Sequence, residues 1–230
     1  MEVWTLLRKL FWQNRSQSSG KYFKGTLAHM LRKQGDCPVC SFCEEELEKF
    51  YWWFFYNHYG ELPWIKRVLK SNGFCSKHAW NIAEMKKGDQ MSFLYRYLVK
   101  DTLRKLEKIA SQGYKDTREE IKPSNICPIC GQISSTSTLW IQQLVKYLED
   151  TEIKELYFGS SGLCMNHFDQ ALHFAPPNVG LTLIEKQLRE LNRLSVDLEK
   201  CSSTLAEQPY EVEKEKAWIK AMGFFAGKEL

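Results

Sequence analysis

The stretch Cys37-Pro38-Val39-Cys40 is followed at a distance by Gly73-Phe74-Cys75-Ser76-Lys77-His78, and the sequence carries this pattern twice. The second copy reads Cys127-Pro128-Ile129-Cys130 and then Gly162-Leu163-Cys164-Met165-Asn166-His167. The first motif recurs after 90 residues and the second after 89, which brings six of eight cysteines and two of five histidines into register. Because an internal repeat governs the architecture of a chain, this pattern predicts two similar halves.

Each copy supplies three thiols and one imidazole, which is the composition of a closed tetrahedral metal site. We expect each Cys-Pro-x-Cys motif to form a tight turn, with Gly131 in a left-handed conformation after the second copy. We expect each Cys-x-x-His motif to open a helix, so that residues i and i+3 share one face. The repeat predicts two zinc ions per chain, each held within one copy. The predicted ligands are Cys37, Cys40, Cys75 and His78 for one ion, and Cys127, Cys130, Cys164 and His167 for the other.

An iron–sulfur cluster is the alternative cofactor, because three thiolates and an imidazole also suit such a cluster. Cys43 extends the first motif to three cysteines at intervals of three, so the first site could be all-cysteine. The equivalent position of the second copy is Ile133, which favours the two histidines as fourth ligands. Cys43 is then a helix residue packed near the site. We interpret the remaining candidates as core or surface residues: Cys201, His29, His58 and His173.

Composition predicts a globular protein: of 230 residues, 43% are hydrophobic and 26% are charged. Residues 1–34 hold seven Lys and Arg against one Glu, a net charge of +6, whereas the whole chain carries +4. This basic, aromatic arm suits a helical pair packed on the body better than a surface for nucleic acid or an anionic membrane. The sequence shows no transmembrane segment and no export signal. We therefore expect a cytoplasmic protein, in which cysteines bind metal instead of pairing as disulfides.

Apolar spacing predicts an all-α protein of two pseudo-repeated helical bundles, each with a Cys3His metal site. The aromatic run from Phe50 to Tyr56 cannot face one core from one helix, so part of it is expected to pack on the other repeat or on a partner protein. A last helix over 211–225 is expected to turn Trp218, Met222 and Phe225 inward. The predicted division is an N-terminal helical arm at 1–34, a first repeat at 35–113, a linker at 114–126, a second repeat at 127–205 and a closing helix at 206–230.

As a set, these motifs resemble a prokaryotic family of unknown function, the DUF6062-type proteins. The resemblance rests on the Cys-Pro-Val-Cys motif with its acidic helix, the Gly-Phe-Cys-Ser-Lys-His element, the second copy, and the terminal stretch from Ala217 to Gly227. It covers roughly residues 30–227 and leaves out the basic arm. Because that family is uncharacterised, the resemblance implies no activity.

Three classes of function remain open. The first is a binding or scaffolding protein held together by two structural zinc ions, which closed ligand sets favour. The second is an iron–sulfur electron carrier or redox sensor. The third is an enzyme or metal-trafficking protein in which one site opens, with His78 or His167 as the ligand that leaves. No catalytic motif is evident in the sequence, so whether the chain is an enzyme stays open.

Overall fold

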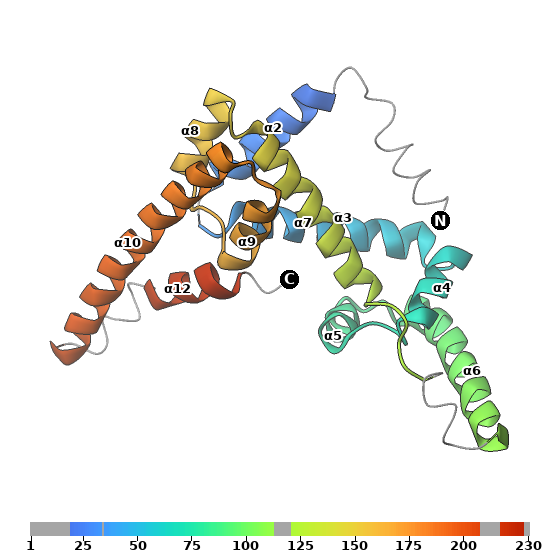
Figure 1. The fold of residues 1–230 in the computed structure, drawn as a ribbon. Helices are drawn as coiled ribbons and strands as arrows, with labels where there is room; N and C mark the ends of the chain where they lie inside the picture. The colour runs from blue at the N-terminus through green and yellow to red at the C-terminus, as the bar shows by residue number, and fades with distance from the viewer. Residues whose placement is uncertain (1–18, 34, 113–120, 208–216, 228–230) are drawn as a thin grey trace. The chain divides into compact units, whose positions relative to one another are not determined.

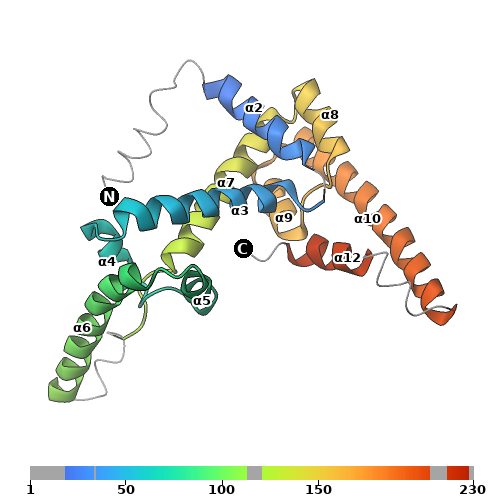
Figure 2. The same cartoon turned by 180° about the vertical axis from the view of Figure 1, so that it is seen from behind.

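The computed structural model describes residues 19–33, 35–112, 121–207 and 217–227, and Figures 1 and 2 show its fold from two opposite sides. Within these ranges the regular structure consists of ten α-helices and one π-helical turn, without a β-strand. The predicted all-α class is confirmed. The helix predicted over 2–14 lies outside the described residues. None of the described helices combines the length and the apolar character that a membrane span requires.

The described chain divides into two compact units. Unit 2 is the continuous segment Glu44–Thr136, and unit 1 combines the described residues up to Cys43 with those from Ser137 onward. Both boundaries between the units fall inside helices, α3 (Pro38–Trp53) and α7 (Pro128–Tyr147). The sequence repeat instead places its division in the linker 114–126, much of which lies outside the described residues, so the domain ranges derived from the repeat stay a prediction.

Unit 1 contains the first residues of α3, the last part of α7 and five further helices. Helix α2 packs on α8, while α9, α10 and α12 pack on one another. Lys24 of α2 forms ion pairs with Asp150 (2.9 Å) and Glu152 (3.0 Å) at the start of α8, so acidic partners of unit 1 neutralise part of the basic arm. The helices of unit 1 are α2 (Ser19–Arg32), α8 (Thr151–Gly159), α9 (Met165–Phe174), α10 (Pro177–Glu207) and α12 (Ala217–Ala226).

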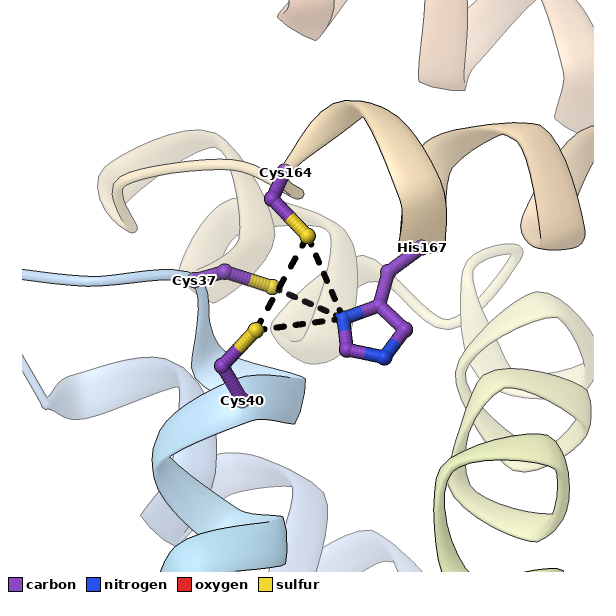
Figure 3. Close-up of side chains that lie close together, drawn as sticks. All are labelled: Cys37, Cys40, Cys164 and His167. Carbon is purple, nitrogen blue, oxygen red and sulfur yellow. Dashed lines mark hydrogen bonds between the residues drawn. The ribbon is translucent and has the colours of Figure 1, made fainter. Parts of the chain in front are cut away.

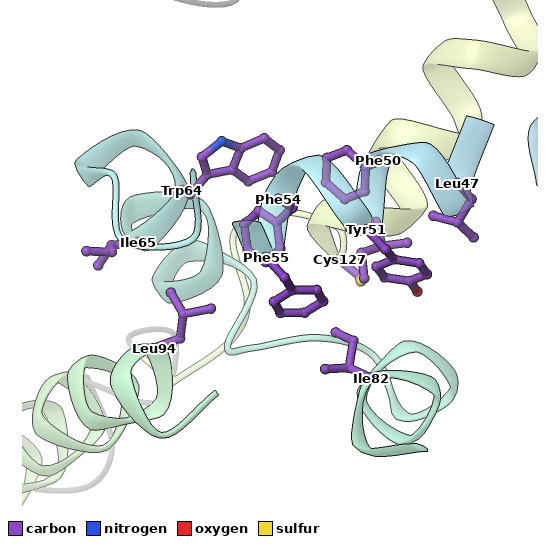
Figure 4. Packing of buried hydrophobic residues seen from close by; sticks show 11 residues of the cluster. Leu47, Phe50, Tyr51, Phe54, Phe55, Trp64, Ile65, Ile82, Leu94 and Cys127 are labelled. Carbon is purple, nitrogen blue, oxygen red and sulfur yellow. The ribbon is translucent and has the colours of Figure 1, made fainter. Parts of the chain in front are cut away.

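Unit 2 contains most of α3, the π-helical turn η2 (Phe54–His58), α4 (Leu62–Lys70), α5 (Ser76–Glu84), α6 (Gly88–Gln112) and the start of α7. Its core is aromatic, and Figure 4 shows Phe50, Phe54, Phe55 and Trp64 packed together. The rings of Phe50 and Phe54 stack with centroids 5.7 Å apart, and Trp64 meets Phe54 edge-on at 5.2 Å. Cys127 and Ile129 belong to the same buried cluster, so the second cysteine motif is part of the core.

The aromatic run of α3 and η2 is split between core and solvent, whereas its expected packing on the other repeat or on a partner stays a prediction. Whereas Phe54 and Phe55 are buried, Trp52 and Tyr56 are each 68% exposed. These two exposed rings stack on each other with centroids 5.1 Å apart.

The prediction for the last helix is wrong in one respect. Trp218, Met222 and Phe225 of α12 are exposed, while Ala217 is buried. Helix α12 reads AWIKAMGFFA and is apolar almost all round. Its pattern therefore has no polar face that would show which side turns toward solvent.

Candidate metal centres

The first group of candidate ligands, here called site 1, consists of Cys37, Cys40, Cys164 and His167, all in unit 1. Its four ligand atoms lie within 4.8 Å of one another. His167 Nδ1 is 3.5 Å from Cys37 Sγ, 3.4 Å from Cys40 Sγ and 3.3 Å from Cys164 Sγ. The Sγ atoms of Cys40 and Cys164 are 3.8 Å apart. Figure 3 shows the three sulfurs and the imidazole converging on one point between α3 and α9.

The second group, here called site 2, consists of Cys75, His78, Cys127 and Cys130, all in unit 2. His78 Nδ1 lies 3.1 Å from Cys75 Sγ, 3.6 Å from Cys127 Sγ and 3.4 Å from Cys130 Sγ. The Sγ atoms of Cys75 and Cys130 are 3.7 Å apart. The two sites therefore share one arrangement of three sulfurs around one ring nitrogen.

The structure brings together all eight residues predicted from the sequence, but the predicted pairing of the motifs is wrong. The Cys-x-x-Cys motif of each copy meets the Cys-x-x-His motif of the other copy. Cys37 and Cys40 join Cys164 and His167, while Cys127 and Cys130 join Cys75 and His78. The physical reason lies in α3 and α7, which each carry a Cys-x-x-Cys motif at the N-terminal end. Each of these two helices begins in one compact unit and ends in the other.

The Cys-Pro-x-Cys motifs also differ locally from the predicted turns. Each motif opens a helix, with Pro38 as the first residue of α3 and Pro128 as the first residue of α7. Proline suits this position because the first helical N–H has no partner within the helix. Gly131 lies inside α7 and is absent from the residues with positive φ. Since the two cysteines are three residues apart at a helix start, they share one face.

Each Cys-x-x-His motif opens a helix as predicted. Cys75 and Cys164 are the N-cap residues of α5 and α9, both with extended backbone, and each histidine lies in the first turn. The glycine two residues before each N-cap has a positive φ, 94° at Gly73 and 74° at Gly162. A side chain is strained in that region, so this part of the repeated motif requires glycine.

Without an ion, hydrogen bonds and burial pull the pKa values of the ligands apart. At site 1, burial raises the pKa of Cys37, and hydrogen bonds with Cys37 and then Cys40 lower the pKa of Cys164. Burial opposes a charged His167, yet hydrogen bonds with Cys164 and Cys40 outweigh it and raise the His167 pKa to about 9. At site 2, burial and the charge of Cys127 raise the pKa of Cys130 to about 12. Without an ion, each site therefore contains a thiol that resists ionisation, and a cation is needed to keep all three thiolates ionised together.

The loop that carries Cys164 is fixed by two buried polar side chains of α10. Lys186 Nζ donates to the backbone oxygens of Phe158 (2.8 Å) and Ser160 (2.5 Å) and pairs with Glu190 (2.6 Å). Gln187 Nε2 donates to the backbone oxygen of Leu163 at 3.0 Å. Both side chains are at most 3% exposed. Lys186 and Gln187 thus support site 1 without being ligands. Sequence reasoning missed them, because neighbouring Lys and Gln residues on a helix resemble an ordinary polar face.

We expect Lys186→Met to destabilise the protein by about 2–4 kcal/mol, because two carbonyls and a carboxylate lose a buried donor. The measurement is urea-induced unfolding followed by circular dichroism. Lys49→Met is the matched control, since Lys49 forms an exposed pair with Glu46 and its loss should cost less than about 1 kcal/mol. Equal effects of the two substitutions would contradict the structural role of Lys186.

The C-terminal end of α12 covers site 1. Gly227 has a φ of 76°, and a Cβ built there would lie 3.3 Å from Cys164 Sγ and 3.6 Å from Cys40 Sγ. Asn166 Nδ2 donates to the backbone oxygen of Ala226 at 3.3 Å, which ties α9 to this end. Beside the site lies a cavity of about 350 Å³, whose lining includes Cys37 and Cys164.

The other cysteine and histidine candidates lie outside both groups, as far as the structure describes them. Cys43 is buried on α3, in agreement with its prediction as a packed helix residue. His58 Nδ1 lies 2.7 Å from a Glu61 carboxylate oxygen, and its ring stacks on Trp53 with centroids 3.9 Å apart. His29 and His173 are exposed. The side chain of Cys201 is outside the described part.

The fold and the sites define a class of protein: an all-α chain with two Cys3His groups, each of which could hold a metal ion. The model of a family of unknown function, DUF6062, matches residues 26–203, and the chain belongs to this family. The family resemblance inferred from the motifs is confirmed over this range, while the terminal stretch from Ala217 to Gly227 lies beyond it. Neither the curated proteins nor the solved structures provide a match.

Proposed function

We propose that the chain binds two zinc ions, one at site 1 and one at site 2, and that both ions are structural. The observation that carries this proposal is the spacing of the ligand atoms. Around one tetrahedral ion, with bonds of about 2.3 Å to sulfur and about 2.0–2.1 Å to nitrogen, two sulfurs lie about 3.8 Å apart and a sulfur and a nitrogen about 3.6 Å apart. Cys75 Sγ and Cys130 Sγ of site 2 are 3.7 Å apart, and Cys40 Sγ and Cys164 Sγ of site 1 are 3.8 Å apart.

The sulfur–nitrogen distances support the same conclusion. They run from 3.1 to 3.6 Å over both sites and all involve Nδ1 of the histidine. Three sulfurs and one nitrogen fill the four positions of tetrahedral zinc, which is the usual composition of a structural site.

An iron–sulfur cluster is less well supported. Such a cluster distributes its protein ligands over two or more irons, so some ligand atoms must lie farther apart than those around one ion. At both sites all four atoms lie within 4.8 Å of one another. Cys43, which could have completed an all-cysteine set, belongs to neither group.

The structural role follows from how the sites are filled and placed. Four protein ligands leave no open position for a substrate, whereas a catalytic zinc keeps one. Cys127 is also part of the buried core cluster of unit 2, so an ion at site 2 links the first turn of α7 to the start of α5 within that core. An enzyme or metal-trafficking role would require one ligand to leave.

A binding or scaffolding role in the cytoplasm completes the proposal. Thiols that ligate zinc must stay reduced, and the cytoplasm provides that condition. The described part of unit 2 exposes large aromatic side chains, Trp52 and Tyr56 at 68% and Trp80 at 70%. Exposed aromatic residues of this kind are enriched where proteins contact other proteins.

Elemental analysis of protein purified without oxygen tests the proposal. We expect two equivalents of zinc per chain and a colourless preparation. A brown preparation that bleaches on reduction would instead assign iron–sulfur clusters. Less than one equivalent of any transition metal would reject metal binding altogether.

We expect zinc affinity to fall as the pH falls, because each ion must displace protons from its ligands. At site 1 the raised pKa values of Cys37 and His167 leave both groups protonated at neutral pH when the ion is absent. Displacement of at least these two protons predicts that the dissociation constant increases by about a hundredfold or more for each unit of pH lost near neutrality. Competition against a chromophoric chelator at several pH values measures this slope. An affinity independent of pH would show that the ligands are not thiols and histidines.

A further inference from the structure

The two sites differ in how far solvent reaches their sulfur atoms. At site 1 all four ligands are buried, with Cys40 at 2% and Cys164 at 1% exposure. At site 2 Cys127 and His78 are equally buried, but Cys75 and Cys130 are partly exposed. Among the cysteines whose side chains the structure describes, these two are the partly exposed ones.

The exposed cysteines of site 2 are also neighbours. Cys75 Sγ and Cys130 Sγ are 3.7 Å apart, and a disulfide needs about 2.05 Å. Cys75 precedes α5 and Cys130 lies in the first turn of α7, so a small movement at two helix ends would suffice. Oxidation of thiolates depends on their ionised form and their exposure, and zinc keeps its thiolate ligands ionised.

We propose that site 2 is an oxidative modification site, where a hydroperoxide converts Cys75 and Cys130 to a disulfide and thereby releases the ion, while site 1 keeps its own. The inference rests on the proposed function, since it requires a zinc ion at each site.

The chemistry balances with one hydroperoxide. The thiolate sulfur of Cys75 attacks the peroxide, forms a sulfur–oxygen bond and breaks the oxygen–oxygen bond, and the departing alkoxide or hydroxide takes a proton from water. The Cys130 thiolate then attacks the oxidised sulfur, forms the disulfide and expels hydroxide, which takes a second proton. Two electrons pass from the sulfurs to the peroxide. Only Cys127 and His78 would then be left to hold a zinc ion at site 2, which would favour its release.

Site 1 provides an internal comparison, because the same ligand set is covered there by the end of α12. The backbone at Gly227 packs against two of the ligand sulfurs, since a Cβ there would lie 3.3 Å from Cys164 Sγ and 3.6 Å from Cys40 Sγ. The cavity lined by Cys37 and Cys164 is a route by which a small oxidant could reach site 1 before site 2. Which of the two sites is oxidised first therefore tests the proposal.

The test uses the unmodified chain with its zinc content measured beforehand, so that a lack of zinc would reject the proposed function and not this inference. Hydrogen peroxide is added at about one equivalent, released zinc is followed with a chromophoric chelator, and free thiols are alkylated for peptide mapping. We expect one zinc to leave about tenfold faster than the other, together with a Cys75–Cys130 disulfide. A faster reaction at site 1, equal rates at the two sites, or a Cys127–Cys130 disulfide would overturn the inference.

Gly227→Ala supplies a matched variant that leaves all eight ligand residues in place. A Cβ there should displace the end of α12, so oxidation of site 1 should accelerate several-fold while the rate at site 2 stays unchanged. An unchanged rate at site 1 would show that this cover does not protect it. Treatment of all cysteines with peroxide in urea and chelator gives their intrinsic rates for comparison.

Discussion

The double variant Cys75→Ser, Cys127→Ser is expected to keep one of its two zinc ions. Both substitutions fall in site 2, so site 1 retains all four ligands. The double variant Cys37→Ser, Cys75→Ser is expected to lose both ions, because it removes one thiolate from each site. If the motifs paired within each sequence repeat, the two outcomes would be reversed. The experiment thus distinguishes the two pairings with the same kind of substitution.

Zinc content by elemental analysis, together with protein concentration from total amino-acid analysis, measures this result. Cys43→Ala is the matched control, since Cys43 is as buried as Cys40 and Cys164 of site 1 but belongs to neither group. It should keep both ions. Loss of an ion from this control would show that Cys43 takes part in binding.

Removal of both ions by a strong chelator is expected to unfold the chain. Binding of a structural zinc contributes a free energy of the order of 10 kcal/mol, and it becomes folding free energy when the unfolded chain has no site. A domain is stable by only about 5–15 kcal/mol, so neither unit should remain folded without its ion. The loss of helical circular dichroism on chelation measures the effect, and added zinc should restore the signal. An unchanged spectrum would mean that the ions are not structural and would favour a site that opens.

The sequence predicted which residues gather at the sites but not how the motifs pair. Short motifs such as Cys37-x-x-Cys40 are local, and their chemistry can be read from spacing alone. Either Cys-x-x-His motif would complete the set equally well, because the two copies carry the same atoms. The pairing is determined by helices α3 and α7, each of which begins in one compact unit and ends in the other. No local sequence pattern predicts this.

Some features lay beyond pattern reasoning for other reasons. The direction in which α12 faces was predicted wrongly because its sequence is apolar almost all round. The cover provided by Gly227 and the anchoring by Lys186 depend on contacts with Cys164 and Ser160, which are distant in sequence. Gly73 and Gly162 are both explained by one backbone requirement, a positive φ, although the glycine expected in a left-handed conformation was Gly131.

The nesting of the sites along the chain constrains the order in which the protein can be completed during synthesis. All ligands of site 2 lie between residues 75 and 130. Site 1 needs both Cys37 and His167, which is 130 positions later. Chains on the ribosome fold unit by unit as segments emerge. The inner unit can therefore take up its ion first, while Cys37 and Cys40 remain reactive, unliganded thiols on the nascent chain. A chain truncated between Cys130 and Cys164 would contain all four ligands of site 2 but only two ligands of site 1, so only site 2 could bind its ion.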